Sequence, residues 1–258
     1  MHSGVRTFTD RLILPFRLFR MPFDLAGSVA VVTGVGKPGQ VGEVVARAFA
    51  DAGAVTCVVD RDEKGVQAQA AALSAAGATA HAFACDLTDP AQAESLAARV
   101  DAIAPGGVRA LVNLAGGYAG GDPVGHLSAE VWHRMFAINA TTAYVCTRAF
   151  LPLLRRARGS VVFFASSAAL PGAAVANMAA YAAAKGVVIT VMRAVATEER
   201  EAGIRANALA PTSIRTEENV RSMGEDVRYV TREAVANWVL WLASPLSEPV
   251  SGQVVRIG

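Results

Sequence analysis

The segment VAVVTGVGKPGQVG, residues 29–42, places an apolar run directly before a glycine-rich turn. An uninterrupted apolar run of this length is typical of a strand buried on both faces of a parallel sheet. Glycines allow the chain to turn tightly, and the helix expected at 42–52 directs its N-terminal amides toward an anion. The segment therefore predicts a strand, turn and helix that can hold the phosphates of a dinucleotide.

The same alternation continues along the chain. Further strands are predicted at 55–60, 80–86, 110–113, 160–164, 205–209 and 253–257, and further helices at 63–76, 90–104, 128–157, 177–202 and 231–243. Such repeated units wind into a right-handed, doubly wound parallel sheet flanked by helices. No linker divides residues 22–258, so we predict a single Rossmann-like α/β domain.

Composition narrows the classes of function. The 258 residues are 53% hydrophobic and carry a net charge of only +2, which does not favour a nucleic-acid surface. The three cysteines have apolar neighbours and favour a reducing compartment, so we expect a cytoplasmic protein. No metal site is expected, because there is no Cys-x-x-Cys pair and the four histidines form no ligand-spaced cluster.

Residues 1–21 form a basic, amphipathic extension that differs from the rest. We expect a surface helix that docks on the body or on a partner subunit; membrane-surface binding or targeting is the alternative. No apolar stretch there is long enough to span a membrane, so no integral membrane segment is predicted. Translation beginning at Met21 would remove the extension.

Asp60 ends the second predicted strand, about 18 residues after Gly42. A carboxylate there can accept hydrogen bonds from the ribose hydroxyls of NAD and repel the 2′-phosphate of NADP. NAD is therefore the expected cofactor, with NADP possible because Arg61 follows directly. The alternative is that Asp60 merely caps the next helix, a role that Asp62 could equally serve.

Two more stretches follow strands at the edge where ligands bind in open α/β sheets. Asp86 and the amide of Leu87 could meet an adenine edge, and the small residues from Asn113 to Gly116 could form a rim for a nucleoside. Either stretch could instead be a simple strand-ending turn.

Tyr181 and Lys185 are four residues apart in a predicted helix, so their side chains project from nearly the same face. A neighbouring ammonium favours the phenolate and should lower the pKa of the tyrosine from about 10. The pair thus predicts a tyrosine that can transfer a proton. The alternative is a surface tyrosine beside a solvated lysine.

Taken in order, these elements resemble the short-chain dehydrogenase/reductase family over residues 22–258. The matching features are the turn at 33–42, Asp60, Asp86-Leu87, the Asn113-Leu-Ala-Gly116 stretch, Asn139, the pair Ser166-Ser167, Tyr181-x-x-x-Lys185 and the segment 204–216. The resemblance implies an NAD(P)-dependent oxidoreductase that moves a hydride between nicotinamide and a secondary alcohol or ketone.

The resemblance also implies residue roles. Tyr181 would be the general acid/base, Ser166 would hydrogen-bond the same substrate oxygen, Lys185 would hold the nicotinamide ribose, and Asn139 would position a relay water. The implied cofactor contacts are Gly34, Gly36, Gly39, Val41, Gly42, Asp60, Arg61, Asp86, Leu87, Asn113, Ala115, Gly116, Tyr181, Lys185, Pro211, Ile214 and Thr216.

Some features depart from the family pattern. The glycine-rich turn is two residues longer than the common form, Leu114 replaces a usual asparagine and Thr212 replaces a usual glycine. Counting forward from Gly159 selects Ser166 as the active serine, whereas counting back from Tyr181 falls nearer Ser167. We favour Ser166, because the loop at 168–176 accommodates an insertion more easily than a buried strand does.

Substrate and assembly are less defined. The segment 217–230, which would cover the substrate, is short and suggests an open pocket. Apolar faces at 140–157 and 177–202, which pair across subunits in relatives, predict a homodimer or homotetramer. The alternative functions are an enoyl reductase, although those relatives space tyrosine and lysine more widely, and a nucleotide-sensing binding protein with little turnover.

Overall fold

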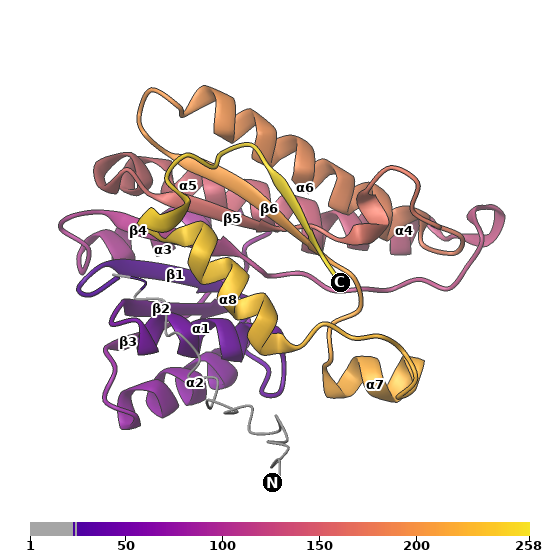
Figure 1. Cartoon of the computed structure of the whole chain (residues 1–258), viewed down its shortest axis with the longest axis horizontal. Helices are drawn as coiled ribbons and strands as arrows, with labels where there is room; N and C mark the ends of the chain where they lie inside the picture. The colour runs from indigo at the N-terminus through magenta and orange to yellow at the C-terminus, as the bar shows by residue number, and fades with distance from the viewer. Residues whose placement is uncertain (1–22, 24) are drawn as a thin grey trace, which may run out of the picture.

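A seven-stranded parallel sheet forms the centre of the molecule (Figure 1). The computed structural model describes residue 23 and residues 25–258, so the predicted extension at 1–21 lies outside the described residues. The strand order is β3-β2-β1-β4-β5-β6-β7, with β1 Val29–Thr33, β2 Val55–Asp60, β3 Ala80–Ala84, β4 Val108–Asn113, β5 Ser160–Phe164, β6 Arg205–Pro211 and β7 Val254–Ile257. The predicted doubly wound α/β fold is confirmed.

Helices cover both faces of the sheet. One face is covered by α1 (Val41–Asp51), α2 (Glu63–Ala75) and α8 (Arg232–Ala243), and the other by α3 (Pro90–Asp101), α5 (Thr142–Ala157) and α6 (Ala179–Glu198). Several helices begin at a side-chain cap that satisfies a free backbone amide; Asp62 caps α2 and Thr231 caps α8.

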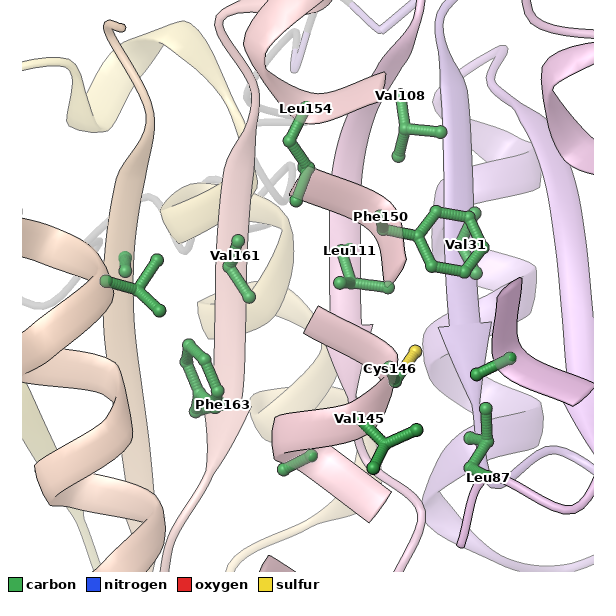
Figure 2. Packing of buried hydrophobic residues seen from close by; sticks show 14 of the residues in the cluster. Val31, Leu87, Val108, Leu111, Val145, Cys146, Phe150, Leu154, Val161 and Phe163 are labelled. Carbon is green, nitrogen blue, oxygen red and sulfur yellow. The ribbon is translucent and has the colours of Figure 1, made fainter. Parts of the chain in front are cut away.

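Successive residues of a strand point to opposite faces of the sheet. Val31 packs in the cluster under α5, whereas its neighbour Val32 packs in the cluster under α1 and α8. Figure 2 shows Cys146 and Phe150 of α5 close to the sheet side chains of the first cluster. Full burial of a side chain such as Phe150 contributes about 1.5–3 kcal/mol. Strands buried on both faces explain why their sequences are apolar throughout.

One prediction of local structure is wrong. The single helix expected at 128–157 is divided into α4 (Ala129–Met135), a π-helical segment at Phe136–Thr141, and α5. Asn139 lies in that segment, and its side-chain amide donates to the Met135 carbonyl, where it competes with the helical backbone. The short segment 217–230 contains one further helix, α7 (Glu217–Met223), for which no helix was predicted.

Helix α6 is long and apolar enough to cross a membrane by length and composition alone. In this structure it packs against β6 and β5 and buries Val188 and Met192 in the core. Its composition is therefore accounted for by packing inside an α/β protein.

Candidate active site

The turn after β1 is built around glycines that other residues could not replace. Gly34 has φ +78°, and a Cβ atom there would lie 2.9 Å from the Ala115 amide nitrogen. A Cβ at Gly42, in the first turn of α1, would lie 2.2 Å from the Gly34 carbonyl oxygen. The turn therefore brings the N-terminus of α1 close to the end of β1, as a phosphate-binding turn requires.

Asp60 faces this turn from the end of β2. Its carboxylate accepts hydrogen bonds from the amides of Gly36 (2.9 Å) and Asp62 (3.1 Å). Asp62, not Asp60, caps α2 through a hydrogen bond from the Gly65 amide. The Asp60 carboxylate is thus held beside the glycine-rich turn and is not used to cap the helix.

Two carboxylates near the turn were not anticipated from the sequence. Glu43 accepts a hydrogen bond of 2.6 Å from the Gly39 amide, and Glu217 of α7 lies 3.9 Å from where a Gly39 Cβ would be. A glutamate in the first turn of a helix is a common capping signal, so Glu43 could have been noticed; Glu217 could not. The residues fit a dinucleotide, provided that Glu43 releases the Gly39 amide to a phosphate.

Thr33 joins the turn to the end of β4. Its buried hydroxyl donates to the Val112 carbonyl and accepts from the amides of Leu114 and Ala115, at 3.0–3.1 Å. Asn113 points into the molecule, where it donates to Thr147 of α5 at 2.7 Å. The stretch from Asn113 to Gly116 therefore lies at the end of β4 as expected, and the buried Asn113 side chain attaches it to α5.

Asp86 follows β3 at the same edge, and its side chain is exposed. Its carboxylate accepts from the amide and hydroxyl of Thr88, at 2.9 and 2.7 Å, while Leu87 is buried. This is the geometry of a strand-ending turn, and both bonds use the same carboxylate oxygen of Asp86.

Asn139 holds the glycines that follow β4. It is 1% exposed, donates to the Gly117 carbonyl at 2.9 Å and accepts from the Gly117 amide at 3.2 Å. A Cβ at Gly116 would lie 2.5 Å from the Asn139 Oδ1 and 3.5 Å from the Lys185 Nζ. Asn139, Gly116 and Lys185 therefore meet at one point.

Tyr181, near the start of α6, lies beside Ser166, which follows β5. Burial raises the pKa of Tyr181, and the interaction with the Ser166 hydroxyl opposes that rise. The expectation that Lys185 lowers the pKa of this phenol is wrong for the protein alone, because desolvation is the largest effect. Of the two candidate serines, Ser166 is the one brought to the tyrosine.

Lys185 is 5% exposed, and its ammonium donates a hydrogen bond of 2.8 Å to the Phe164 carbonyl at the end of β5. Burial lowers its pKa from 10.5 to about 8. Its Nζ lies 5.9 Å from the centre of the Tyr181 ring. The alternative of a solvated surface lysine is excluded by this burial.

Tyr118 packs edge-on against Tyr181 with ring centres 5.3 Å apart. It is 56% exposed, and its proximity contributes to the raised pKa of Tyr181. Tyr118 therefore lies on the solvent side of the proposed proton donor.

The remaining predicted residues lie at or near the same edge. Pro211 ends β6, Ile214 bridges to Val230, and Thr216 caps α7 by accepting from the Asn219 amide at 3.2 Å. Val41 is buried at the start of α1, whereas Arg61 is exposed just after β2. In Figure 1, α7 stands beyond the carboxyl end of β6, next to this edge.

The fold and this edge define a Rossmann-type oxidoreductase that uses a nicotinamide cofactor. A family model described as enoyl-(acyl carrier protein) reductase matches residues 34–257. The chain belongs to the short-chain dehydrogenase/reductase family and is an NAD(P)-dependent oxidoreductase.

Named relatives cover nearly the whole chain. Galactitol 2-dehydrogenase of Rhizobium johnstonii is 33% identical over 254 residues, which span 93% of this chain and 96% of the relative. A Xanthobacter autotrophicus protein named inactive 2-(S)-hydroxypropyl-CoM dehydrogenase 2 is 34% identical, over 83% of this chain and 97% of the relative. A solved Beutenbergia cavernae structure, assigned as an NAD(P)-dependent gluconate 5-dehydrogenase with bound NADP, is 32% identical with a TM-score of 0.81; the match covers 91% of this chain and 96% of that one.

Proposed function

We propose that the protein interconverts a secondary alcohol and a ketone, with Tyr181 as the group that gives or takes the proton. The observation that carries this proposal is the half-buried Tyr181 beside the buried Ser166 at the carboxyl edge of the sheet. The nicotinamide cofactor, when bound, supplies or accepts the hydride. Ser166 would hydrogen-bond the substrate oxygen while Tyr181 donates a proton to it in reduction, or removes one in oxidation.

Lys185 and Asn139 would support this proton transfer. The raised pKa of Tyr181 keeps the phenol protonated near neutrality, which suits reduction of a ketone. Oxidation of an alcohol needs the phenolate, and a protonated Lys185 placed near the cofactor ribose would favour it. The closeness of Asn139, Gly116 and Lys185 supports a relay water held near these residues.

We propose that NAD is preferred over NADP. The Asp60 carboxylate is held beside Gly36, where it would repel a 2′-phosphate, whereas Arg61 is exposed to solvent. We propose that bound NAD contacts all the residues that the family resemblance implies as cofactor contacts.

The substrate proposed is a polyol or related hydroxy compound, because relatives include galactitol, D-threitol and L-fucose dehydrogenases. A panel of polyols, sugars and the matching ketones, followed by absorbance of the reduced nicotinamide, tests the reaction with NAD and NADP in parallel. Turnover that requires Tyr181 supports the proposal. Tight NADH binding without turnover on the panel would favour a nucleotide-sensing protein, a possibility consistent with a relative that is named inactive.

An enoyl reductase is the second candidate, favoured by the description of the matching family model. The one-turn spacing of Tyr181 and Lys185 favours the alcohol and ketone reaction instead. A crotonyl thioester reduced faster than a 3-oxoacyl thioester would favour the enoyl reductase.

We also propose a cytoplasmic homo-oligomer. The free cysteines of the described residues are buried, and Tyr144 of α5 and Val187 of α6 expose apolar surface, 50% and 38% respectively. Sedimentation analysis tests the assembly: a dimer or tetramer is expected.

A further inference from the structure

A cavity of about 990 Å³ lies at the opposite edge of the sheet from the active site. It is formed where β4 and β6 begin, at the ends of α5 and α6, and by the loop before β7. The arginines that line it are Arg109, Arg158, Arg193, Arg200 and Arg205, and the acidic lining residue is Glu248. A protein with a net charge of +2 thus concentrates five positive charges around one hollow.

Two of these arginines are fixed within the fold. Arg205 donates to the carbonyls of Leu242, Ser244 and Ser247, and Arg109 donates to those of Ala157 and Arg158, at 2.9–3.2 Å. Carbonyl partners accept from the N–H groups but carry no charge to balance the guanidinium groups. Burial, and to a lesser degree the nearby Arg109, lower the pKa of Arg205 to about 10, while Glu248 opposes this fall.

The other three arginines are exposed and reach the cavity from its sides. The ion pairs that arginines form in the described residues involve Arg148, Arg155, Arg156 and Arg215, none of which lines this cavity. The side chains of Arg158, Arg193 and Arg200 therefore remain able to bind an anion with several N–H donors each.

Arg158 occupies an unusual backbone position beside the cavity. It follows α5 with φ +48°, a left-handed conformation in which glycine or asparagine is usual and which costs about 1–2 kcal/mol for other residues. Its side chain lies along Gly203, where a Cβ would approach Arg158 Cγ to 3.2 Å. An arginine kept in a strained backbone position and laid over a glycine is typical of a functional constraint.

We propose that this cavity binds a small anion carrying two or more phosphate groups, as a site separate from the cofactor turn. Guanidinium groups bind phosphate oxygens through paired N–H donors, and several guanidiniums around a recess favour a multiply charged ligand over a single phosphate. The Ser251 hydroxyl, which accepts from the Ala206 amide, offers one further donor to the ligand.

The test is calorimetric titration of the full chain with pyrophosphate at fixed ionic strength. Saturating NAD is present, or NADP if that cofactor binds more tightly, so that the phosphate-binding turn after β1 is occupied. We expect one pyrophosphate per chain, about tenfold weaker binding in Arg193→Gln or Arg158→Gly, and a larger loss in the double variant. Arg47→Gln, an exposed arginine of α1 outside the cavity, is the matched control and should bind like the parent.

Arg158→Gly separates binding from folding. Glycine suits the left-handed conformation, so this variant should keep or raise its melting temperature while losing pyrophosphate affinity. If Arg158→Gly folds poorly, Arg193→Gln on the exposed face of α6 still measures the contribution of a cavity arginine to pyrophosphate binding. Absence of saturable binding, or equal affinity in the parent and the double variant, would overturn the proposal. So would a change of oligomeric state in the variants without a change in affinity, since the cavity would then be a subunit contact.

Discussion

The two edges of the sheet hold their polar groups in different ways. At the carboxyl edge, Asn139 and Lys185 are almost fully buried and Asp60 is held by backbone amides; each has defined hydrogen bonds. At the amino edge, Arg158, Arg193 and Arg200 are exposed around an open cavity. Groups that must be oriented for chemistry are placed by buried contacts, whereas groups that attract an anion can remain solvated until the anion arrives.

This difference predicts where substitutions will act. Changes at the carboxyl edge should alter turnover, cofactor choice and the pH dependence of stability. Changes among the exposed arginines should alter anion binding and have only small effects on stability.

The largest effect is expected for Tyr181→Phe. Removing the hydroxyl eliminates the proposed proton donor, so kcat should fall by about 10²–10⁴ while the circular dichroism spectrum is unchanged. Initial rates with the best substrate of the panel measure this. Tyr144→Phe, which alters an exposed phenol of α5, should retain full activity. A Tyr181→Phe variant that turns over at the parent rate would remove this residue from the reaction.

The second-largest effect is expected for Asp60→Asn, which should change the cofactor preference. Loss of the negative charge reduces repulsion of the 2′-phosphate, so the ratio of kcat/KM for NADP to that for NAD should rise by roughly 10- to 100-fold. Asp62→Asn, two residues away, is the control, because asparagine also caps a helix and the preference should not change. Equal shifts in both variants would contradict the assignment of Asp60.

Lys185→Met should raise stability while it abolishes most activity. The folded pKa of Lys185, about 8, lies below its ordinary value of 10.5, so the unfolded chain binds more protons between these values. The contribution of Lys185 to stability should therefore rise with pH from about 8 to above 10. Burial raises the pKa of the Cys57, Cys85 and Cys146 thiols, which lowers stability as pH rises above about 9, so the lysine contribution is the difference between the parent and Lys185→Met.

Near pH 7 the same variant avoids burying a charge but leaves the Phe164 carbonyl without its donor, so we expect a net gain of roughly 1 kcal/mol. Urea unfolding between pH 7 and 10.5 measures both effects. Lys64→Met, at an exposed position of α2, should show neither effect. A difference in stability between the parent and Lys185→Met that falls over this pH range would contradict the assigned burial of Lys185.

The smallest effect is expected for Arg158→Gly, which should stabilise the fold by about 1 kcal/mol because glycine adopts positive φ without strain. Asn177→Gly is the comparison: Asn177 has φ +62°, but asparagine tolerates this region, so the gain there should be smaller. The denaturant midpoints of the two variants and the parent measure these two gains in stability. A loss of stability in Arg158→Gly would show that the arginine side chain itself stabilises the loop after α5.

Most of the sheet could be predicted from the sequence, because the central strands β1, β4 and β5 are almost wholly buried and apolar and are bounded by polar or glycine-rich turns. The helix at 128–157 could not be predicted correctly, since Asn139 of the π-helical segment bonds both the Met135 carbonyl and the backbone of Gly117, which lies 22 residues away. Helix α7 is a short helix with a Thr216 cap, and its seven residues give no clear amphipathic pattern.

What the sequence determined alone was local: the glycine turn after β1, the carboxylate at the end of β2, and the placement of Tyr181 and Lys185 one helical turn apart. These depend on spacing along one strand, turn or helix. The tertiary structure decided how deeply each group is buried, and therefore that the pKa of Tyr181 rises where the neighbouring lysine alone would have lowered it. It also gathered arginines from positions 109 to 205 around one cavity, which no local pattern encodes because only the winding of the chain brings those strand and helix ends together.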